Sequence, residues 1–386
     1  MKYIHIAEPM VGEEEWKEIQ EPIITGWLTQ GPKVREFEKK FAYKHGVKHA
    51  IAVTSCTTAL HLALRAVGVS QGDYVIVPSF TWIATANAVE YCGATPVFCD
   101  NDLNTYNIDV KKLEELLQKM YKAGKVVKAI VPVHLFGLVA EMDSIRELAK
   151  QYGGIRIVED AACAAGAKYH DQFAGSLGDI GCFSFHPRKV ITTGEGGMCT
   201  TNDALLSEKM SVLRSHGAVL SEEQRHHSDR PYLMPDFNEL GFNYRMSDLQ
   251  GAMGSVQIDK LDALIAERRE WAKFYDEKLK AVRWIIPPKA PMGCFHSYQA
   301  YVCRVDKRYT NKSRNQIMQA LHEAGIGSRA GTHAIHELGY YSQKYHLTKD
   351  DFQIAAELYA NTIALPLHNR MTAEDYRRVV ETIRKL

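Results

Sequence analysis

The stretch AIAVTSCTTALHLALRAVGVSQGDYVIVP, residues 50–78, contains the pattern that indicates the fold. The apolar run 50–53 predicts a buried strand, the amphipathic segment after it predicts a helix that ends near Gly68, and 74–78 predict a second buried strand. A strand, a helix and a strand in this order form a βαβ unit, whose two strands run parallel. The N-terminal part of the chain is therefore expected to hold a parallel sheet.

The same alternation continues along the next hundred residues. The segments 96–100, 127–135 and 155–160 predict further buried strands, and helical patterns separate them. One of these helices is expected to begin after Asp109, whose side chain can cap its first turn. The chain is thus predicted to be an α/β protein with a mostly parallel central sheet flanked by helices. Ligands of such sheets bind at the carboxyl ends of the strands.

The pattern changes after about residue 245. The following stretch, 247–282, is helical in character and has no internal proline, and Ser247 can cap it. A helix of this length usually bridges two domains or lines an interface, and the segments after it predict a smaller α+β domain. We therefore expect a large domain with an N-terminal segment at 1–250, and a linker helix with a small C-terminal domain at 251–386.

Composition excludes several classes of protein. The chain has 386 residues, 47 basic and 46 acidic side chains and 46% apolar residues, so it is too apolar and too neutral for a disordered chain. The charge balance shows no basic footprint for nucleic acid, and no apolar run approaches the roughly 20 residues that span a bilayer. The N-terminus lacks a signal-peptide pattern. We expect a soluble cytoplasmic protein that binds neither nucleic acid nor a membrane.

The cysteines and histidines do not predict a metal site. None of the eight cysteines has CxxC spacing, and most lie in apolar stretches, so buried reduced thiols are expected. The pair His226 and His227 lies in a polar stretch that predicts a solvated loop. Familiar motifs are missing as well: the sequence has no GxGxxG after a strand, no GxxxxGK[ST], no GxSxG and no HExxH. Hydride transfer, NTP hydrolysis and α/β-hydrolase chemistry are disfavoured.

Three segments carry an ordered set of chemical groups instead. In TSCTTALHLAL, 54–64, hydroxyl residues begin a helix, and a helix N-terminus suits a phosphate. The strand 155–160 ends in Asp160, which can cap a turn or hold a protonated heterocyclic nitrogen. Lys189 follows a second strand-like run, where a lysine can have a lowered pKa and form a Schiff base, and Arg188 would favour its neutral form. A phosphate cup, an Asp and a Lys are what pyridoxal phosphate requires.

Motifs along the whole chain support a closer identification. The most specific is SFHPRKVITTGEGG, 184–197, and others are VIVPSFTWIATANAV, 75–89, VEDAACAAGA, 158–167, and GFNYRMSDLQGAMG, 241–254. With these motifs the chain resembles the DegT/DnrJ/EryC1/StrS family of sugar-nucleotide aminotransferases. The resemblance implies the aspartate-aminotransferase fold (PLP-dependent transferase fold type I) and pyridoxal 5'-phosphate as cofactor.

The resemblance also implies roles for individual residues. Lys189 matches the Schiff-base lysine that moves the proton, and Asp160 matches the carboxylate that pairs with the pyridinium nitrogen. Trp82 matches the aromatic residue that stacks on the ring, and Thr57 and Thr58 match the phosphate cup.

Four further positions complete the cofactor site that the resemblance implies. Ser184 matches a serine that donates to the phosphate. Asn243 matches an asparagine that reaches the phosphate from the neighbouring subunit, which implies a homodimer with shared active sites. Cys163 replaces the Gln, Glu or His that many members place near the ring oxygen, and Cys56 replaces a frequent Gly of the phosphate turn. The contacts of these two cysteines stay open.

The resemblance implies a ping-pong reaction. L-Glutamate would give its amino group and leave as 2-oxoglutarate, and a nucleotide-linked keto sugar, expected to be an NDP-4-keto-6-deoxyhexose, would receive it. The product would be an amino sugar for surface polysaccharides or glycosylated metabolites. The sugar pocket is expected to use the loop RAGTHAIHELGYY, with His333 and His336 as candidate substrate residues. The nucleotide and the aminated carbon, C3 or C4, stay open.

Two alternatives use the same scaffold or cofactor. A sugar dehydratase or a carbocycle aminotransferase would be other chemistry on this fold, but relatives that dehydrate replace the lysine by His, so Lys189 favours transamination. A non-catalytic regulator that binds pyridoxal phosphate would generally carry an appended DNA-binding domain. The matched region begins near residue 10 and reaches the C-terminus, which disfavours this alternative.

Overall fold

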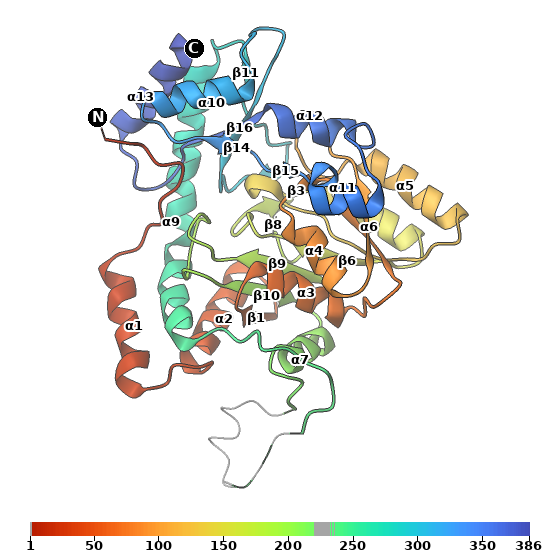
Figure 1. Cartoon of the computed structure of the whole chain (residues 1–386). Helices are drawn as coiled ribbons and strands as arrows, with labels where there is room; N and C mark the ends of the chain where they lie inside the picture. Colours follow the sequence, from red (N-terminus) through yellow and green to blue (C-terminus); the bar gives the residue numbers. More distant parts are fainter. Residues whose placement is uncertain (1, 220–231, 233, 235) are drawn as a thin grey trace.

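A seven-stranded sheet, ordered β1-β10-β9-β6-β5-β2-β4, forms the centre of the fold (Figure 1). Only β10 pairs antiparallel with both of its neighbours, and the four pairs from β9 to β4 are parallel. The predicted α/β class with a mostly parallel sheet is therefore confirmed. The strands are β1 (His49–Val53), β2 (Tyr74–Pro78), β4 (Thr95–Cys99), β5 (Val127–Ile130), β6 (Arg156–Asp160), β9 (Ile180–Ser184) and β10 (Gly197–Thr201).

The computed structural model describes residues 2–219, 232, 234 and 236–386. His226 and His227 lie outside the described residues, so their assignment to a solvated loop stays a prediction. Within the described part of the chain, no helix combines the length and the apolar character that a membrane span needs.

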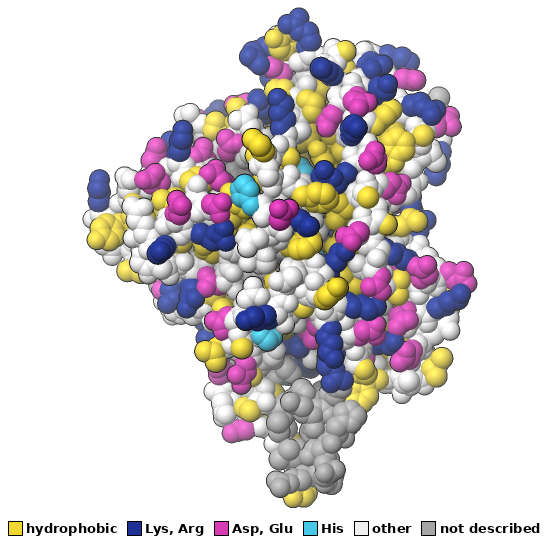
Figure 2. All heavy atoms as spheres, turned by 180° about the vertical axis from the view of Figure 1, so that it is seen from behind, with side chains coloured by type: hydrophobic (Ala, Val, Ile, Leu, Met, Phe, Trp, Pro, Cys, Tyr) yellow, Lys and Arg dark blue, Asp and Glu magenta, His cyan; other side chains and the backbone are white. Residues whose placement is uncertain are grey.

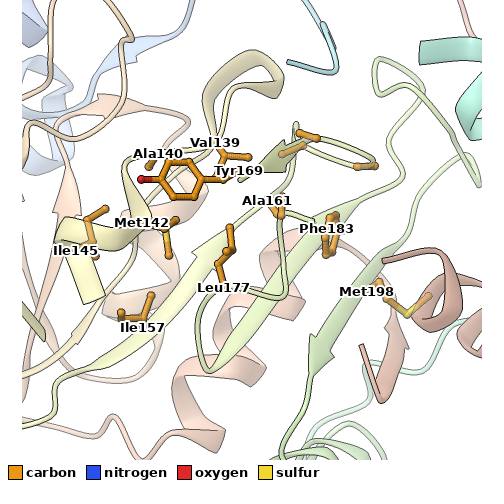
Figure 3. Close-up of a cluster of buried hydrophobic side chains, with 14 of the residues drawn as sticks. Val139, Ala140, Met142, Ile145, Ile157, Ala161, Tyr169, Leu177, Phe183 and Met198 are labelled. Atoms are coloured by element: carbon orange, nitrogen blue, oxygen red, sulfur yellow. The ribbon is translucent and has the colours of Figure 1, made fainter. Parts of the chain in front are cut away.

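Hydrophobic clusters cover both faces of the central sheet. Along β2, Ile76 belongs to one cluster and Val75 and Val77 to the other, because successive side chains of a strand point to opposite faces. Figure 3 shows part of the first cluster, to which Met142 of α6 and Ile157 of β6 both contribute side chains. The helices around the sheet are α2 (Pro32–His45), α3 (Cys56–Ala66), α4 (Ala84–Tyr91), α5 (Val110–Lys122), α6 (Met142–Gln151) and α7 (Ala204–Leu213).

The predicted helix caps are confirmed. The Asp109 carboxylate accepts the N–H groups of Lys111 at 2.8 Å and Lys112 at 3.0 Å at the start of α5. The Ser247 hydroxyl accepts the N–H of Gln250 at the start of α9 (Asp248–Leu279). These caps satisfy N–H groups that the first turn of a helix leaves without a partner.

The long helix α9 runs from the part of the molecule that contains the central sheet to the part that contains a second, smaller sheet (Figure 1). Its first half packs against α1 (Glu13–Thr25) and α2, and its last turns lie beside α13 (Ala373–Lys385). There a second, antiparallel sheet has the order β11-β13-β16-β14 and its own hydrophobic cluster. The expected domain division after residue 250 falls in the first turn of α9 and stays a prediction.

The smaller elements surround the second sheet and join it to the first. Its strands are β11 (Ile285–Ile286), β13 (Tyr301–Val305), β14 (Arg329–Ala330) and β16 (Thr362–Leu365), and the helices α10 (Arg314–Glu323) and α12 (Gln353–Asn361) contact it. The helix α11 (Gly339–Tyr345) instead packs into a hydrophobic cluster of the central sheet. Two short ladders complete the fold: β3 (Phe80–Thr81) with β15 (His333–Ala334), and β7 (Lys168–Tyr169) with β8 (Gln172–Phe173) and β12 (Cys294–Phe295). Single 3₁₀ turns cover Leu135–Gly137 and Ile335–Glu337.

The charged side chains do not segregate on the surface that Figure 2 shows. Acidic and basic groups are intermixed over that face, which is in keeping with a net charge of +1. All eight cysteines are free thiols, and six of them are buried, whereas Cys163 and Cys294 are partly exposed. The expectation of buried reduced thiols is confirmed for those six.

His45 of α2 is fully buried and neutral. Its Nε2 accepts the N–H of Gly166 at 3.2 Å, so its Nδ1 carries the hydrogen and donates to the Phe41 carbonyl at 3.1 Å. Burial lowers the pKa of His45 to about 4, although the Phe41 carbonyl favours the charged form. The folded chain therefore resists protonation at this residue.

We expect acid to destabilise the protein through this histidine. Between pH 6.5 and about 4, the unfolded chain binds a proton at residue 45 that the folded chain does not bind, so the free energy of unfolding falls as the pH falls. The loss over this window amounts to about 3 kcal/mol for one group. His45→Gln keeps a donor and an acceptor without titrating, and it should flatten the dependence. Urea unfolding at pH 7 and pH 4.5 measures the difference, and equal losses in both proteins would contradict the prediction.

Candidate active site

A cavity of about 310 Å³ lies at the carboxyl end of the central sheet. β6 ends at its wall with Asp160, and β9 ends there with Ser184. The second sheet lines the opposite side through Val302 of β13 and Arg329 of β14. The cavity therefore has the strand-end position that parallel sheets use for ligands.

The N-terminus of α3 forms an anion-binding wall of this cavity. Ser55, Cys56 and Thr57 line it, and the Ser55 hydroxyl caps the helix by accepting the N–H of Thr58 at 3.2 Å. The N–H groups of Cys56 and Thr57 have no acceptor among the described residues. Free N–H groups at the positive end of a helix dipole favour a phosphate.

The residues that form the phosphate cup in the structure differ from the predicted pair of threonines. Thr57 lines the cavity, but Thr58 does not. The Thr58 hydroxyl donates to the Ser55 carbonyl at 2.8 Å, so Thr58 stabilises the start of α3. Ser55, which the sequence analysis did not single out, lines the cavity instead of Thr58.

Gly197 of β10 lets the sheet approach the start of α3. A Cβ at this position would lie 2.4 Å from the carbonyl carbon of Ser55 and 2.7 Å from the nitrogen of Cys56. No side chain fits such a gap, so the cup requires glycine there. The GEGG motif was the signal that could have identified this residue.

Asp160 is buried and held by two hydrogen bonds. Its Oδ2 accepts the hydroxyl of Thr85 at 2.7 Å, and its Oδ1 accepts the N–H of Ala162 at 3.2 Å. Burial raises the pKa of Asp160, while the hydrogen bonds from Thr85 and Ala162 and the charge of Lys189 partly offset that effect. Thr85, in the first turn of α4, is a positioning residue that the sequence analysis missed.

The neighbouring carboxylate, Glu159, has a structural role. It is fully buried and accepts the Nε2–H of His134 at 2.9 Å, whose Nδ1 accepts the N–H of Ala140. Glu159 also accepts three backbone N–H groups, from Gly175, Leu177 and Gly178. Adjacent strand residues point to opposite faces, so Glu159 holds a loop while Asp160 lines the cavity.

Lys189 lines the same cavity and contacts Cys163. Its Nζ donates to the Cys163 Sγ at 3.1 Å. Burial acts to lower the pKa of Lys189, but Cys163, Cys56 and Asp160 outweigh it, so that the pKa lies above its ordinary value. The lowered pKa expected from the sequence is therefore wrong, because the expectation considered Arg188 and not the two thiols.

Trp82 and Ser184 also lie in the cavity wall. The Trp82 side chain is 54% exposed and packs edge-on against His333, with ring centroids 5.4 Å apart. Its indole therefore presents an accessible aromatic surface at the cavity. Ser184 is half-buried at the end of β9 and adds a hydroxyl group to the cavity wall.

Besides Thr58, three predicted site residues lie outside this cavity. Asn243 is exposed, and the carbonyl of its neighbour Tyr244 accepts the N–H of Thr54 at 3.0 Å, just before α3. His333 contacts Trp82 without lining the cavity. His336 is fully buried, with its Nδ1 2.6 Å from the Ser79 hydroxyl, so it does not face the cavity as a candidate substrate residue would.

Curated relatives match the chain along nearly its whole length. The GDP-perosamine synthase of Caulobacter vibrioides is 41% identical over 382 residues, which cover 98% of this chain and 97% of that protein. The spore coat polysaccharide biosynthesis protein SpsC of Bacillus subtilis is 38% identical over 385 residues, covering 100% and 97% of the two chains.

Solved structures show the same fold. The putative sugar aminotransferase Spr1654 of Streptococcus pneumoniae, solved in PMP and PLP forms, superposes in its PMP form with a TM-score of 0.89 at 28% identity, over 99% of this chain and 98% of that one. Helicobacter pylori PseC gives a TM-score of 0.90 at 28% identity, over 100% and 99%. A model of the DegT/DnrJ/EryC1/StrS aminotransferase family matches residues 9–384. Because this match spans nearly the whole chain, the protein belongs to that family and is a pyridoxal-phosphate-dependent aminotransferase.

Proposed function

We propose that this aminotransferase moves the amino group of L-glutamate to a keto sugar linked to a nucleoside diphosphate, of the 4-keto-6-deoxyhexose class. The observation that carries the proposal is one cavity lined by Lys189, Asp160 and the free N–H groups of α3. The names of the Caulobacter and Bacillus relatives support an amino sugar for a surface polysaccharide as the product.

The residues at one end of the cavity fit the phosphate of pyridoxal phosphate. The N–H groups of Cys56 and Thr57 would hold it, together with the hydroxyls of Ser55 and Ser184. Hydrogen bonds from a helix N-terminus to a phosphate need no basic side chain, and the cup described above contains none.

The residues beside this cup fit the cofactor ring. Asp160 would hold the ring nitrogen protonated, and the Thr85 hydroxyl keeps this carboxylate in position. The Trp82 indole would cover one face of the ring, and Cys163 would lie near the ring oxygen. When bound, pyridoxal phosphate supplies an aldehyde carbon that carries the amino group and a ring that takes up electron density.

Lys189 has the position of the proton-transfer group. Its Nζ would bind the cofactor covalently at rest, and after release it would take the proton from the Cα of L-glutamate. In the second half of the reaction, the same atom would deliver a proton to the sugar carbon that receives the amino group. The 3.1 Å contact with Cys163 keeps Nζ inside the cavity.

The visible spectrum of the purified protein tests this function. The protein should be yellow, borohydride should leave a pyridoxyl group on Lys189 in peptide mass mapping, and L-glutamate should bleach the band. GDP-, UDP- and dTDP-linked 4-keto-6-deoxyhexoses should then be tested for restoring it, and the sugar that does so identifies the acceptor. A colourless protein that takes up no added pyridoxal phosphate would overturn the proposal.

We further propose that two copies share their active sites through Asn243. Its exposed position outside its own cavity supports a contact with a second copy. The exposed apolar side chains Trp16, Ile23 and Ile24 of α1 support self-association as well.

We expect Asn243→Ala and Lys189→Ala to complement each other. Each variant alone should be nearly inactive, since one loses a phosphate contact and the other the amine. A mixed dimer restores one complete site, with Lys189 from one copy and Asn243 from the other, so an equal mixture should regain roughly a quarter of wild-type activity. Subunit exchange followed by an activity assay measures this, and a mixture without any regain would contradict sharing.

We also propose a cytoplasmic location. All eight cysteines are free, and reducing compartments keep thiols in this state. Cell fractionation with detection of the protein would test it, and recovery among secreted proteins would overturn it.

A further inference from the structure

The peptide group that joins Arg188 to Lys189 is hydrogen-bonded at both ends. Its N–H, which belongs to Lys189, donates to the His186 carbonyl at 2.8 Å within the same turn. Its carbonyl, which belongs to Arg188, accepts the side-chain amide of Gln299 at 2.8 Å, and it accepts no other hydrogen bond from the residues that the structure describes. Because a peptide group is planar, these two bonds fix the direction in which the Lys189 side chain leaves the backbone.

The later part of the connection between β9 and β10 has partners of its own. The N–H of Thr192 donates to the Gln257 side chain at 3.1 Å. The hydroxyl of Thr192 donates to the Phe185 carbonyl at 2.7 Å, which closes the connection at its base. Loss of the Gln299 contact would therefore free the peptide group before Lys189 and leave the end of the connection in place.

Gln299 belongs to the other part of the molecule. It lies two residues before β13 of the second sheet, and 111 positions separate it from Arg188. Its side chain lines the same cavity as Lys189. The contact thus joins the turn that carries the reacting amine to the chain that enters the smaller sheet.

The backbone around Gln299 is itself held from two sides. The buried Arg268 of α9 donates to the carbonyls of Tyr298 at 3.2 Å and of Gln299 at 3.3 Å. The N–H of Ser297 donates to the Gly137 carbonyl at 3.0 Å. Tyr298 has a φ of 48°, in the left-handed region that residues other than glycine rarely adopt. Such a conformation persists only where the surroundings fix it, so the Gln299 side chain extends from a rigid support.

We propose that Gln299 is a positioning residue for Lys189, because it holds the Arg188 carbonyl and so keeps the Lys189 amine in line for proton transfer. This inference rests on the proposed function, in which that one amine serves both half-reactions. Proton transfer requires the two atoms to lie within hydrogen-bond reach, and a displacement of about 1 Å already lowers its rate. Motion of the peptide group before Lys189 would therefore slow the chemical step without changing the affinity for substrate.

Hydrogen exchange of the holoenzyme, followed by mass spectrometry, tests this positioning without turnover. Gln299→Met has a side chain of similar length but no donor, and it should speed exchange in a peptide covering 186–192 by roughly fivefold. Gln299→His retains an N–H donor and should recover part of the protection. Gln319→Met is the matched control, since it removes a glutamine hydrogen bond to Glu323 on α10, outside the cavity, and it should exchange as the wild type does.

Single-turnover kinetics with L-glutamate give the second readout. Gln299→Met should lower the maximal rate by roughly fivefold and leave the half-saturating concentration unchanged, whereas loss of a substrate-binding residue would raise that concentration. Unchanged exchange, faster exchange at an unchanged maximal rate, or an effect confined to the half-saturating concentration would overturn the role of Gln299 alone. If borohydride leaves no pyridoxyl group on Lys189 of the wild type, the proposed function fails, and this proposal fails with it.

Discussion

Replacing Lys189 by alanine is expected to lower turnover by at least about 10⁴-fold while pyridoxal phosphate still binds. The variant loses the only amine that the described residues place in the cavity, and with it the group to which the proton transfer is assigned. The α3 N-terminus and Asp160 are unchanged, and they should continue to hold the cofactor without a covalent bond. The measurement is single-turnover kinetics with L-glutamate, together with cofactor content after dialysis.

Lys168→Ala provides the control for Lys189. Lys168 lies over the Phe173 ring at 4.5 Å, outside the cavity, and its replacement should leave both readouts near the wild-type values. After borohydride reduction, the wild type and this control should carry the pyridoxyl group and Lys189→Ala should not. Turnover of Lys189→Ala within tenfold of the wild type would refute the role assigned to this residue.

Asp160→Asn is expected to lower kcat by about 10²–10³-fold. A carboxylate stabilises a protonated ring nitrogen, whereas a neutral amide does not, so the ring takes up less electron density. The replacement is nearly isosteric, and the hydrogen bond from Thr85 can persist on the amide oxygen. Kinetics of the half-reaction with L-glutamate measure the effect, and the visible spectrum should shift because the ring loses its proton.

The adjacent Glu159 offers the matched comparison for Asp160. Glu159→Gln should lower the free energy of unfolding by about 3 kcal/mol, because the buried site contains four donors and the amide brings two more hydrogens. Its kcat, measured on folded protein at low temperature, should stay near that of the wild type. A large kcat loss in Glu159→Gln with normal stability, or a mild effect of Asp160→Asn, would contradict the division of roles between the two carboxylates.

Local sequence patterns determined the elements of this protein and its central chemistry. Apolar runs and amphipathic segments predicted the strands β1, β2, β4, β5 and β6 and the helices between them, but not the two-residue strand β3. Asp109 and Ser247 marked helix starts, since a cap is an interaction within one turn. Lys189 and Asp160 could be identified because their motifs are specific, and both line the cavity.

Local sequence patterns could not predict contacts between residues that are far apart in the chain. The Thr85 hydroxyl binds Asp160 although 75 positions separate them, and Arg329 and Cys163 line the same cavity although Arg329 belongs to a different sheet. The side chains of Thr58 and His336 could bind a ligand, but both form hydrogen bonds within the protein. The Thr58 hydroxyl donates to the Ser55 carbonyl in the helix cap, and the buried His336 is hydrogen-bonded to the Ser79 hydroxyl.

The sequence by itself therefore determined the main strands and helices, and it identified the lysine and the aspartate of the site. Only the tertiary structure decided which of those groups face the cavity. The physical reason is that periodicity and capping depend on neighbours within a few residues, whereas the cavity arises from the strand order. β10 inserts between β1 and β9, and β14 approaches from a different sheet, so the lining residues come from segments that no local pattern connects.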